Sequence, residues 1–144
     1  MKITFLDFIK PILPLLFLVS LYAHGENVKI KIVVNDDKTV IATLVDNETS
    51  HEFLSLLPLT LTLTDYNQTE KISDLPKKLT KKGAPPAITP TTGDIAYYAP
   101  WGNLAIYYKD FGNSPGLIRL GTVDSGLEFL TGSDSLKVKI SRVE

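Results

Sequence analysis

Cysteine is absent from the 144-residue sequence, which excludes disulfide bonds and a lipidated N-terminal cysteine. Histidine is nearly absent, with only His24 and His51. A metal site built from Cys and His side chains is therefore not expected, and no metal or other cofactor is predicted. The fold has to be held together by its hydrophobic core alone, which a chain of this length can form.

An excess of charge of either sign is also lacking, because the chain has 15 basic and 16 acidic residues. Nucleic acids and anionic membrane surfaces attract proteins that carry a clear basic excess. The composition therefore gives no reason to expect a nucleic-acid partner or binding to an anionic membrane surface.

Long hydrophobic runs are missing except for one short run near the N-terminus. A basic start precedes the uncharged residues 11–22, and small residues follow within 23–25. This run fits the core of a signal peptide and is short for a transmembrane helix, although an uncleaved membrane anchor is the alternative. We divide the chain into a signal peptide, residues 1–25, and one domain, residues 26–144. We predict that this domain is exported, to the periplasm or the medium, without a stable membrane anchor.

Alternating apolar and polar residues, rich in β-branched side chains, predict strands in most of the domain. The pattern is clearest at 59–64, where the leucines should face the core and the threonines the solvent. The predicted strands are residues 28–34, 39–45, 59–64, 94–99, 104–109, 117–123 and 136–140. With one helix and a second short one near 125–130, they predict a mainly β fold, a small closed or nearly closed antiparallel β-barrel. The first and last strands share a lysine-alternating pattern, and we expect them to pair and close the barrel.

The main predicted helix begins near Asn47 and ends before Pro58. Thr49 and Glu52 have the spacing of a capping box, in which each side chain bonds a free backbone amide at the start of the helix. The stretch 65–93 contains many breakers and is interpreted as a mostly irregular loop that contributes to a binding groove.

Aromatic residues crowd the predicted hairpin over 94–109. Neighbouring residues of a strand point to opposite faces, so one tyrosine of each Tyr-Tyr pair should face the core. Trp101 lies in the turn, where a large apolar side chain has less core to join. We interpret the hairpin as one wall of a shallow groove for a peptide or small ligand; packing in the core and between strands is the alternative. The candidate ligand-binding residues are Tyr98, Trp101, Asn103, Tyr107, Phe111 and Arg119.

Other polar residues have an ordinary structural role as their simpler interpretation. His51 lies in the first turn of the predicted helix and should be solvated. Asp94, Asp110 and Asp124 flank strand ends, where aspartate commonly bonds the backbone amides of turns. The lysines within 77–82 should form a solvated basic loop, with an anionic partner as the alternative. No catalytic residue is assigned.

Two stretches make the chain resemble a known family. Residues 56–61 read Leu-Leu-Pro-Leu-Thr-Leu, and residues 93–104 read Gly-Asp-Ile-Ala-Tyr-Tyr-Ala-Pro-Trp-Gly-Asn-Leu. Together with the order of hairpin, helix, strand, loop and hairpin, they resemble the small bacterial cyclophilin-like proteins over residues 28–141. The resemblance implies a cyclophilin-like barrel and, for that group, no firmly assigned activity.

The more distant resemblance to true cyclophilins implies prolyl isomerisation, the rotation about the peptide bond before proline. Those enzymes hydrogen-bond the substrate with an arginine on the strand after the helix, but strand 59–64 has no basic residue. Arg119 falls on a later strand and does not match that position. We therefore predict an exported, non-catalytic domain that binds a peptide or small ligand; the alternative is a weak or divergent peptidyl-prolyl cis-trans isomerase.

Overall fold

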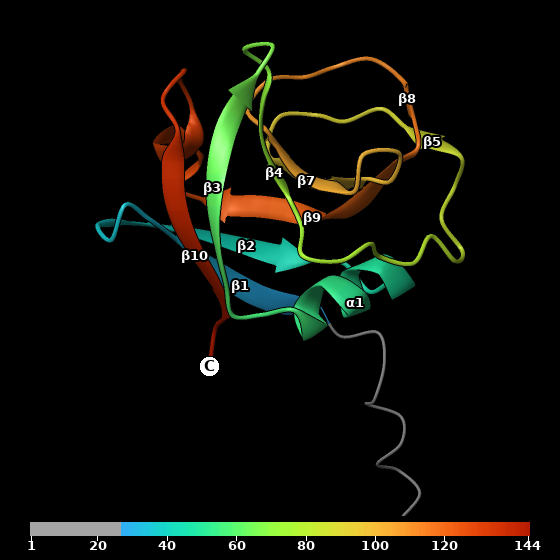
Figure 1. The fold of residues 1–144 in the computed structure, drawn as a ribbon, viewed down its shortest axis with the longest axis horizontal. Coiled ribbons are helices and arrows are strands. Elements are labelled where there is room, and N and C mark those ends of the chain that lie inside the picture. The colour runs from blue at the N-terminus through green and yellow to red at the C-terminus, as the bar shows by residue number, and fades with distance from the viewer. Residues whose placement is uncertain (1–26) are drawn as a thin grey trace, which may run out of the picture.

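The computed structural model describes residues 27–144, and its main strands form one closed barrel (Figure 1). The predicted signal peptide lies outside the described residues. Each barrel strand is antiparallel to its neighbours, in the order β1-β10-β3-β4-β7-β6-β9-β2. The elements are β1 (Val28–Val34), β2 (Lys38–Leu44), α1 (Glu48–Ser55), β3 (Leu59–Tyr66), β4 (Glu70–Asp74), β5 (Ala87–Ile88), β6 (Asp94–Tyr98), β7 (Asn103–Tyr107), β8 (Ser114–Pro115), β9 (Leu117–Ser125), the 3-10 helix η2 (Leu127–Leu130) and β10 (Leu136–Arg142).

The first and last strands lie side by side and close the barrel, as the sequence predicts. Ile32 of β1 pairs with Ile140 of β10, and each is 1% exposed. The intervening lysines, Lys31 and Lys139, are exposed. Period-two alternation thus places one side of each strand in the barrel interior and the other in solvent. The predicted mainly β, closed antiparallel barrel is confirmed.

The barrel interior is filled by branched apolar side chains and capped at one end by α1 (Figure 1). Leu63 of β3 is fully buried while the neighbouring threonines of this strand are exposed, which confirms the predicted alternation. Phe53 of α1 is 0% exposed and joins the same cluster. Burying one such side chain contributes roughly 1.5–3 kcal/mol to stability. Among residues 27–144, none of the helices combines the length and apolar character needed to cross a bilayer.

β2 and β9 approach each other closely at Gly121. A Cβ atom on this residue would lie 2.2 Å from the carbonyl oxygen of Thr43 and 2.8 Å from Cα of Leu44. No side chain fits into that space, so the β2–β9 contact requires glycine at this position.

The start of α1 differs from the prediction. Asn47 is the N-cap: its Oδ1 accepts a hydrogen bond from the backbone N–H of Ser50 at 2.8 Å. The predicted capping box was wrong because both of its side chains bind Thr80 in the long loop. Thr49 Oγ1 donates to the Thr80 carbonyl at 2.7 Å, and Glu52 Oε1 accepts from the Thr80 N–H at 2.8 Å. These contacts fasten the loop to the helix.

The stretch 65–93 is only partly irregular, and the prediction missed a barrel strand within it. It contains the end of β3, the strand β4, and β5, which forms a separate two-stranded sheet with β8. The sequence pattern did not predict β4 because Lys71 occupies an inward-facing position of this strand. This lysine is 0% exposed, and its Nζ donates to the carbonyl oxygens of Gly132 and Asp134, both at 2.5 Å. A buried charge satisfied by backbone carbonyls replaces the apolar residue that alternation would require.

Candidate functional site

Two apolar clusters lie on opposite faces of the same strands. Tyr97 and Leu104 belong to the main core inside the barrel. Because neighbouring residues alternate between faces, the next residues along β6 and β7 point outward. They form a second buried cluster on the outer face of the barrel, made of Ala96, Ala105, Tyr107 and Leu117.

The outer faces of β4 and β7 form the floor of a pocket of about 300 Å³, which we call the outer pocket. In the β4–β7 register, Glu70 lies opposite Tyr107 at one end of the floor, and Asn103 lies at the other end. The walls come from the β3–β4 turn, the β6–β7 hairpin and the segment 111–115. The lining residues are Tyr66, Asn67, Glu70, Ile72, Tyr98, Trp101, Asn103, Tyr107, Phe111, Asn113, Ser114 and Pro115.

Trp101 projects into this region from the β6–β7 turn. Gly102 follows it with a φ of 72°, a left-handed conformation that glycine adopts without strain. The indole stands nearly perpendicular to Tyr98 and Tyr66, with ring centroids 5.3 Å and 5.8 Å apart and interplanar angles of 81° and 82°. Trp101 nevertheless remains 57% exposed. These three rings, which we call the aromatic corner, are fixed by mutual contact and open to solvent.

Glu70 is the only carboxylic acid among the lining residues, which include no lysine, arginine or histidine. Burial raises the pKa of Glu70, the hydrogen bond with Tyr107 lowers it, and the nearby charge of Asp65 raises it further. Burial and the adjacent Glu70 raise the pKa of Tyr107 well above its ordinary value. The phenol therefore keeps its proton and donates to Glu70, whose remaining oxygen lone pairs are available to a ligand.

Asn103 is a buried polar residue at the other end of the pocket floor. It is 3% exposed, and its Nδ2 donates to the carbonyl of Leu104 at 3.0 Å. Within the described part of the chain, its Oδ1 has no hydrogen-bond partner. Leaving a buried acceptor unsatisfied costs about 1–3 kcal/mol. Because Oδ1 has almost no solvent-accessible surface, a ligand N–H or O–H group could satisfy it only if the side chains that cover it move aside.

The end of β3 next to Glu70 is held by ionic and hydrogen-bond contacts. Asp65 Oδ1 lies 3.8 Å from Lys71 Nζ and also accepts a hydrogen bond from the hydroxyl of Tyr108. Burial and this contact with Asp65 raise the pKa of Tyr108 to about 12. The β3–β4 hairpin, which supplies Tyr66 and Glu70, is thus attached both to the residue that follows β7 and to the loop before β10.

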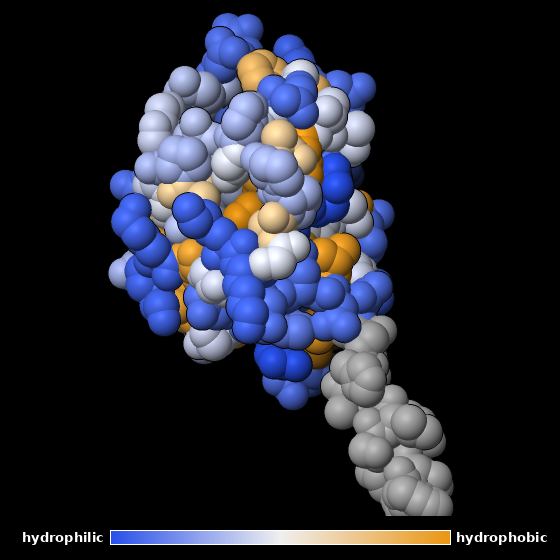
Figure 2. Space-filling view, turned by 90° about the vertical axis from the view of Figure 1, so that its right-hand side faces the viewer, coloured by the Kyte–Doolittle hydropathy of each residue, from blue (hydrophilic) through white to orange (hydrophobic). Residues whose placement is uncertain are grey.

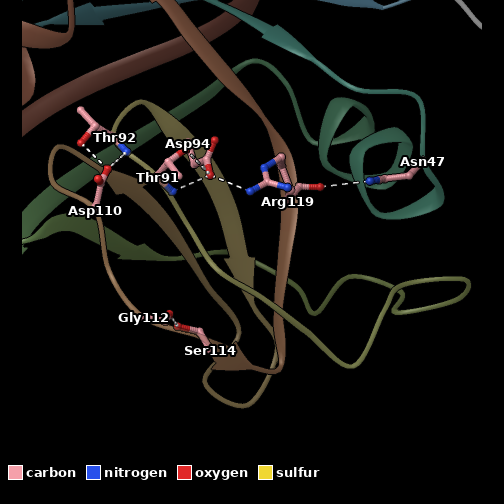
Figure 3. Close-up of polar contacts among 8 residues, drawn as sticks. All are labelled: Asn47, Thr91, Thr92, Asp94, Asp110, Gly112, Ser114 and Arg119. Carbon is pink, nitrogen blue, oxygen red and sulfur yellow. Dashed lines mark hydrogen bonds and ion pairs between the residues drawn. The ribbon is translucent and has the colours of Figure 1, made fainter.

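Arg119 is not among the lining residues of the outer pocket and is paired with Asp94 (Figure 3). Its Nη2 donates to Asp94 Oδ2 at 2.8 Å, and the same oxygen accepts from the backbone N–H of Thr91 at 2.8 Å. The carbonyl of Arg119 accepts from Asn47 Nδ2 at 3.0 Å. Through these contacts Arg119 connects β9 with β6 and with the start of α1.

Asp110 binds a backbone amide of a turn, in agreement with the simpler sequence interpretation, whereas Asp124 binds side chains of β1 and β2. Asp110 Oδ1 accepts from the N–H and the hydroxyl of Thr92, at 2.7 and 2.8 Å (Figure 3). Asp124 Oδ2 accepts from Thr43 Oγ1 at 2.6 Å and from Lys29 Nζ at 3.1 Å. The hydrogen bonds from Thr92 hold the pKa of Asp110 below its usual value, and the bond from Thr43 does the same for Asp124.

His51 and the loop lysines are exposed and are not among the residues that line the outer pocket. Lys78 Nζ nevertheless lies close to Gly102 in the β6–β7 turn. His51 is exposed, with its Nε2 2.6 Å from Asp46 Oδ1. The loop lysines are exposed as predicted: Lys77, Lys78, Lys81 and Lys82. Within residues 27–144, no three His, Cys, Asp or Glu side chains are grouped so that they could hold a metal ion.

Five of the six candidate residues lie together in the outer pocket, and Arg119 is the exception. Their role in binding a ligand stays a prediction. The sequence interpretation assigned the stretch 65–93 to the groove without naming residues in it, and, apart from Phe111, it did not include the segment before β9. The lining residues it did not name are Tyr66, Asn67, Glu70, Ile72, Asn113, Ser114 and Pro115. Recognition of β4 would have placed Glu70 and Ile72 on one strand face, but the inward Lys71 between them concealed that strand.

The fold and the pocket define a small, closed antiparallel barrel with an aromatic pocket on its outer face. A sequence model of the Cyclophilin-like family matches residues 32–141, and the chain belongs to this family. The solution structure of the hypothetical protein AF2241 from Archaeoglobus fulgidus is similar, with a TM-score of 0.65 and 15% sequence identity. The similarity covers 84% of this chain and 98% of that one, and at this identity it shows the fold alone. No match is found among curated proteins.

Proposed function

We propose that this cyclophilin-like domain is a non-catalytic binding module whose ligand, a peptide or small molecule, occupies the outer pocket. The observation that carries the proposal is the aromatic corner. Trp101 is held edge-on by Tyr66 and Tyr98, yet 57% of it remains exposed. Ligand pockets are typically 300–1,000 Å³, aromatic, and equipped with a few polar groups. A pocket of about 300 Å³ matches the lower end of that range, which suits one peptide side chain with its backbone.

The neighbouring surface supports a small ligand more than a broad hydrophobic partner. Figure 2 shows the face that carries β5 and β8, where hydrophilic residues separate the hydrophobic areas. Large contiguous apolar patches mark stable protein–protein interfaces. Recognition at this face would therefore depend on the pocket, to which Ser114 and Pro115 of β8 contribute.

Isothermal titration calorimetry tests the proposal directly. The titrants are capped tripeptides, acetyl-Ala-X-Ala-methylamide with each amino acid at X, and a set of small-molecule fragments. We expect saturable binding for at least one titrant and a loss of about tenfold or more in Trp101→Ala. Val143→Ala is the control, because Val143 is also exposed, at 42%, but does not line the pocket. Absence of saturable binding by every titrant would remove the binding function.

A protease-coupled assay on prolyl peptides tests the isomerase alternative. The pocket lining contains no arginine, and β3 carries no basic residue to hydrogen-bond a prolyl substrate. We expect no acceleration above the uncatalysed rate. Acceleration that disappears in Trp101→Ala would assign the pocket to prolyl isomerisation instead.

We also propose that the domain acts outside the cytoplasm after export. The uncharged run 11–22, between a basic start and small residues, supports this assignment. Mass spectrometry of the protein recovered from its native host should find an N-terminus at Glu26. Recovery of the intact chain in the membrane fraction would indicate an anchor in place of a cleaved signal.

A further inference from the structure

We infer that the outer pocket binds a peptide through the cationic side chain of a lysine or arginine, which lies beside Glu70 while a backbone N–H bonds Asn103 Oδ1. This inference rests on the proposed binding function and names the class of ligand. Three independent features of the pocket support it: the aromatic walls, the charge of the lining, and the unpaired oxygen of Asn103.

The aromatic walls favour a cation. Five of the lining residues are aromatic: Tyr66, Tyr98, Trp101, Tyr107 and Phe111. An ammonium or guanidinium group within about 6 Å of a ring face is attracted by the negative potential of the π-system, most strongly for tryptophan. Trp101 meets Tyr66 and Tyr98 at nearly right angles and remains 57% exposed, so its indole is accessible to a cation.

The charge of the lining favours a cation as well. Glu70 is partly buried and has no basic residue beside it in the pocket. Lys71, its neighbour in sequence, points to the opposite face of β4 and bonds the carbonyls of Gly132 and Asp134. A positively charged ligand would therefore supply the counter-charge that Glu70 lacks among the lining residues, with hydrogen bonds strengthened by that charge.

The position of Asn103 favours a peptide over a simple amine. Asn103 and Tyr107, which lies opposite Glu70, are four positions apart on β7, and four steps along a strand span about 13 Å. Glu70 and Asn103 both line the pocket, so a single ligand that reaches both has to bridge a distance of this order. A lysine or arginine residue carries an N–H on its backbone and a cation at the end of an apolar stem. That stem would lie over Ile72, in the middle of the floor.

Calorimetry with matched probes on the full chain tests this inference. The probes are the capped tripeptides with lysine, arginine and norleucine at X, together with n-butylammonium. Norleucine has the apolar chain of lysine without the ammonium group, and n-butylammonium has the cation without the peptide. We expect lysine and arginine to bind about tenfold or more tightly than norleucine, and n-butylammonium to bind about tenfold or more weakly than the lysine peptide.

Two glutamate variants locate the charge effect. In Glu70→Gln the preference for lysine over norleucine should disappear. Glu128→Gln makes the same chemical change at an exposed position outside the pocket, and the preference should remain. Equal affinity for the norleucine and lysine peptides would contradict recognition of a cationic side chain, although it would still agree with binding of a peptide in the pocket. Equal affinity for n-butylammonium and the lysine peptide would contradict recognition of the peptide backbone. Absence of binding by every titrant would contradict the proposed binding function as well.

Discussion

Trp101 and Tyr98 meet edge to face, with ring centroids 5.3 Å apart and an interplanar angle of 81°. Both rings belong to the β6–β7 hairpin, so the contact is set within one short segment of chain. It holds Trp101 in place without burying it, since 57% of the residue stays exposed. An orientated and solvent-accessible indole is suited to contact with a ligand.

This exposure predicts that Trp101 matters more for binding than for stability. Trp101→Ala should lower the free energy of unfolding by about 1.5 kcal/mol or less, the range of one aromatic pair. The control is Tyr97→Ala, because Tyr97 is 1% exposed in the core and its hydroxyl accepts from the Leu79 N–H at 3.0 Å. Its loss should cost about 3–5 kcal/mol in urea denaturation. Equal destabilisation by the two substitutions would make Trp101 a structural residue.

Because Oδ1 of Asn103 is unpaired, we predict that one substitution changes stability and ligand affinity in opposite directions. Asn103→Leu removes a buried acceptor whose unsatisfied state costs about 1–3 kcal/mol. It also loses the bond from Nδ2 to the Leu104 carbonyl. The free energy of unfolding should therefore stay the same or rise by about 1 kcal/mol, while the affinity for the lysine tripeptide falls. Strong destabilisation with unchanged affinity would show that Asn103 serves the fold.

The raised pKa of Glu70 predicts a characteristic pH dependence. The groups that face Glu70 are Asp65 and Tyr66 of β3, Tyr107 of β7, and Tyr108, which directly follows β7. Below about 4.5 Glu70 is protonated in both the folded and the unfolded chain. As the pH rises through the folded pKa, the folded state must accept a disfavoured charge, so stability falls relative to Glu70→Gln. Affinity for the lysine tripeptide should rise over the same interval.

Parallel denaturation and calorimetry series, from pH 4 upward, measure both curves. The Glu70→Gln variant should lose the pH dependence of affinity in this interval. An affinity that is independent of pH in the wild-type protein would contradict a charged contact at Glu70.

The ion pair of Arg119 predicts a structural role for this residue. Arg119→Ala removes the charge-assisted bond to Asp94, which is 2% exposed, and should lower the free energy of unfolding by about 1–2 kcal/mol. This loss is smaller than for a fully buried ion pair, because the Arg119 side chain is partly exposed. Ligand affinity should not change, as in the control Arg142→Ala, which alters an exposed arginine. A loss of affinity confined to Arg119→Ala would place this residue in the binding site.

The close approach of β2 and β9 predicts that Gly121 is irreplaceable. Gly121→Ala places a Cβ 2.2 Å from the Thr43 carbonyl oxygen, and we expect a loss of about 1–3 kcal/mol in thermal denaturation. Gly112→Ala is the matched control, because a Cβ there meets no atom within 4 Å. Equal stability of the two variants would mean that the strands separate without penalty.

The barrel was predictable because its main signal is local. Alternation in 59–64 and the matching lysine patterns of the first and last strands follow directly from the two-residue period of a strand. The roles of Thr49 and Glu52 and the strand β4 were not, because partners far along the chain decide them. Thr49 bonds Thr80, and Lys71 bonds carbonyl groups 61 and 63 residues away. Sequence patterns do not record such contacts.

The candidate site could likewise be predicted only in part. The aromatic side of the pocket could be predicted, because Tyr98, Trp101 and Tyr107 lie close together in one hairpin. The polar side could not, because Glu70 reaches the hairpin only through the β4–β7 pairing. The residue that distinguishes a cationic ligand from a neutral one therefore became visible only with the fold.

The most direct test of the account is a ¹H–¹⁵N NMR titration of the full chain with acetyl-Ala-Lys-Ala-methylamide. We expect the indole N–H of Trp101 and the side-chain amide of Asn103 to shift most strongly, together with backbone amides of residues 111–115. Saturating shifts centred on the β1–β10 pair, or the absence of shifts at Trp101, would contradict it.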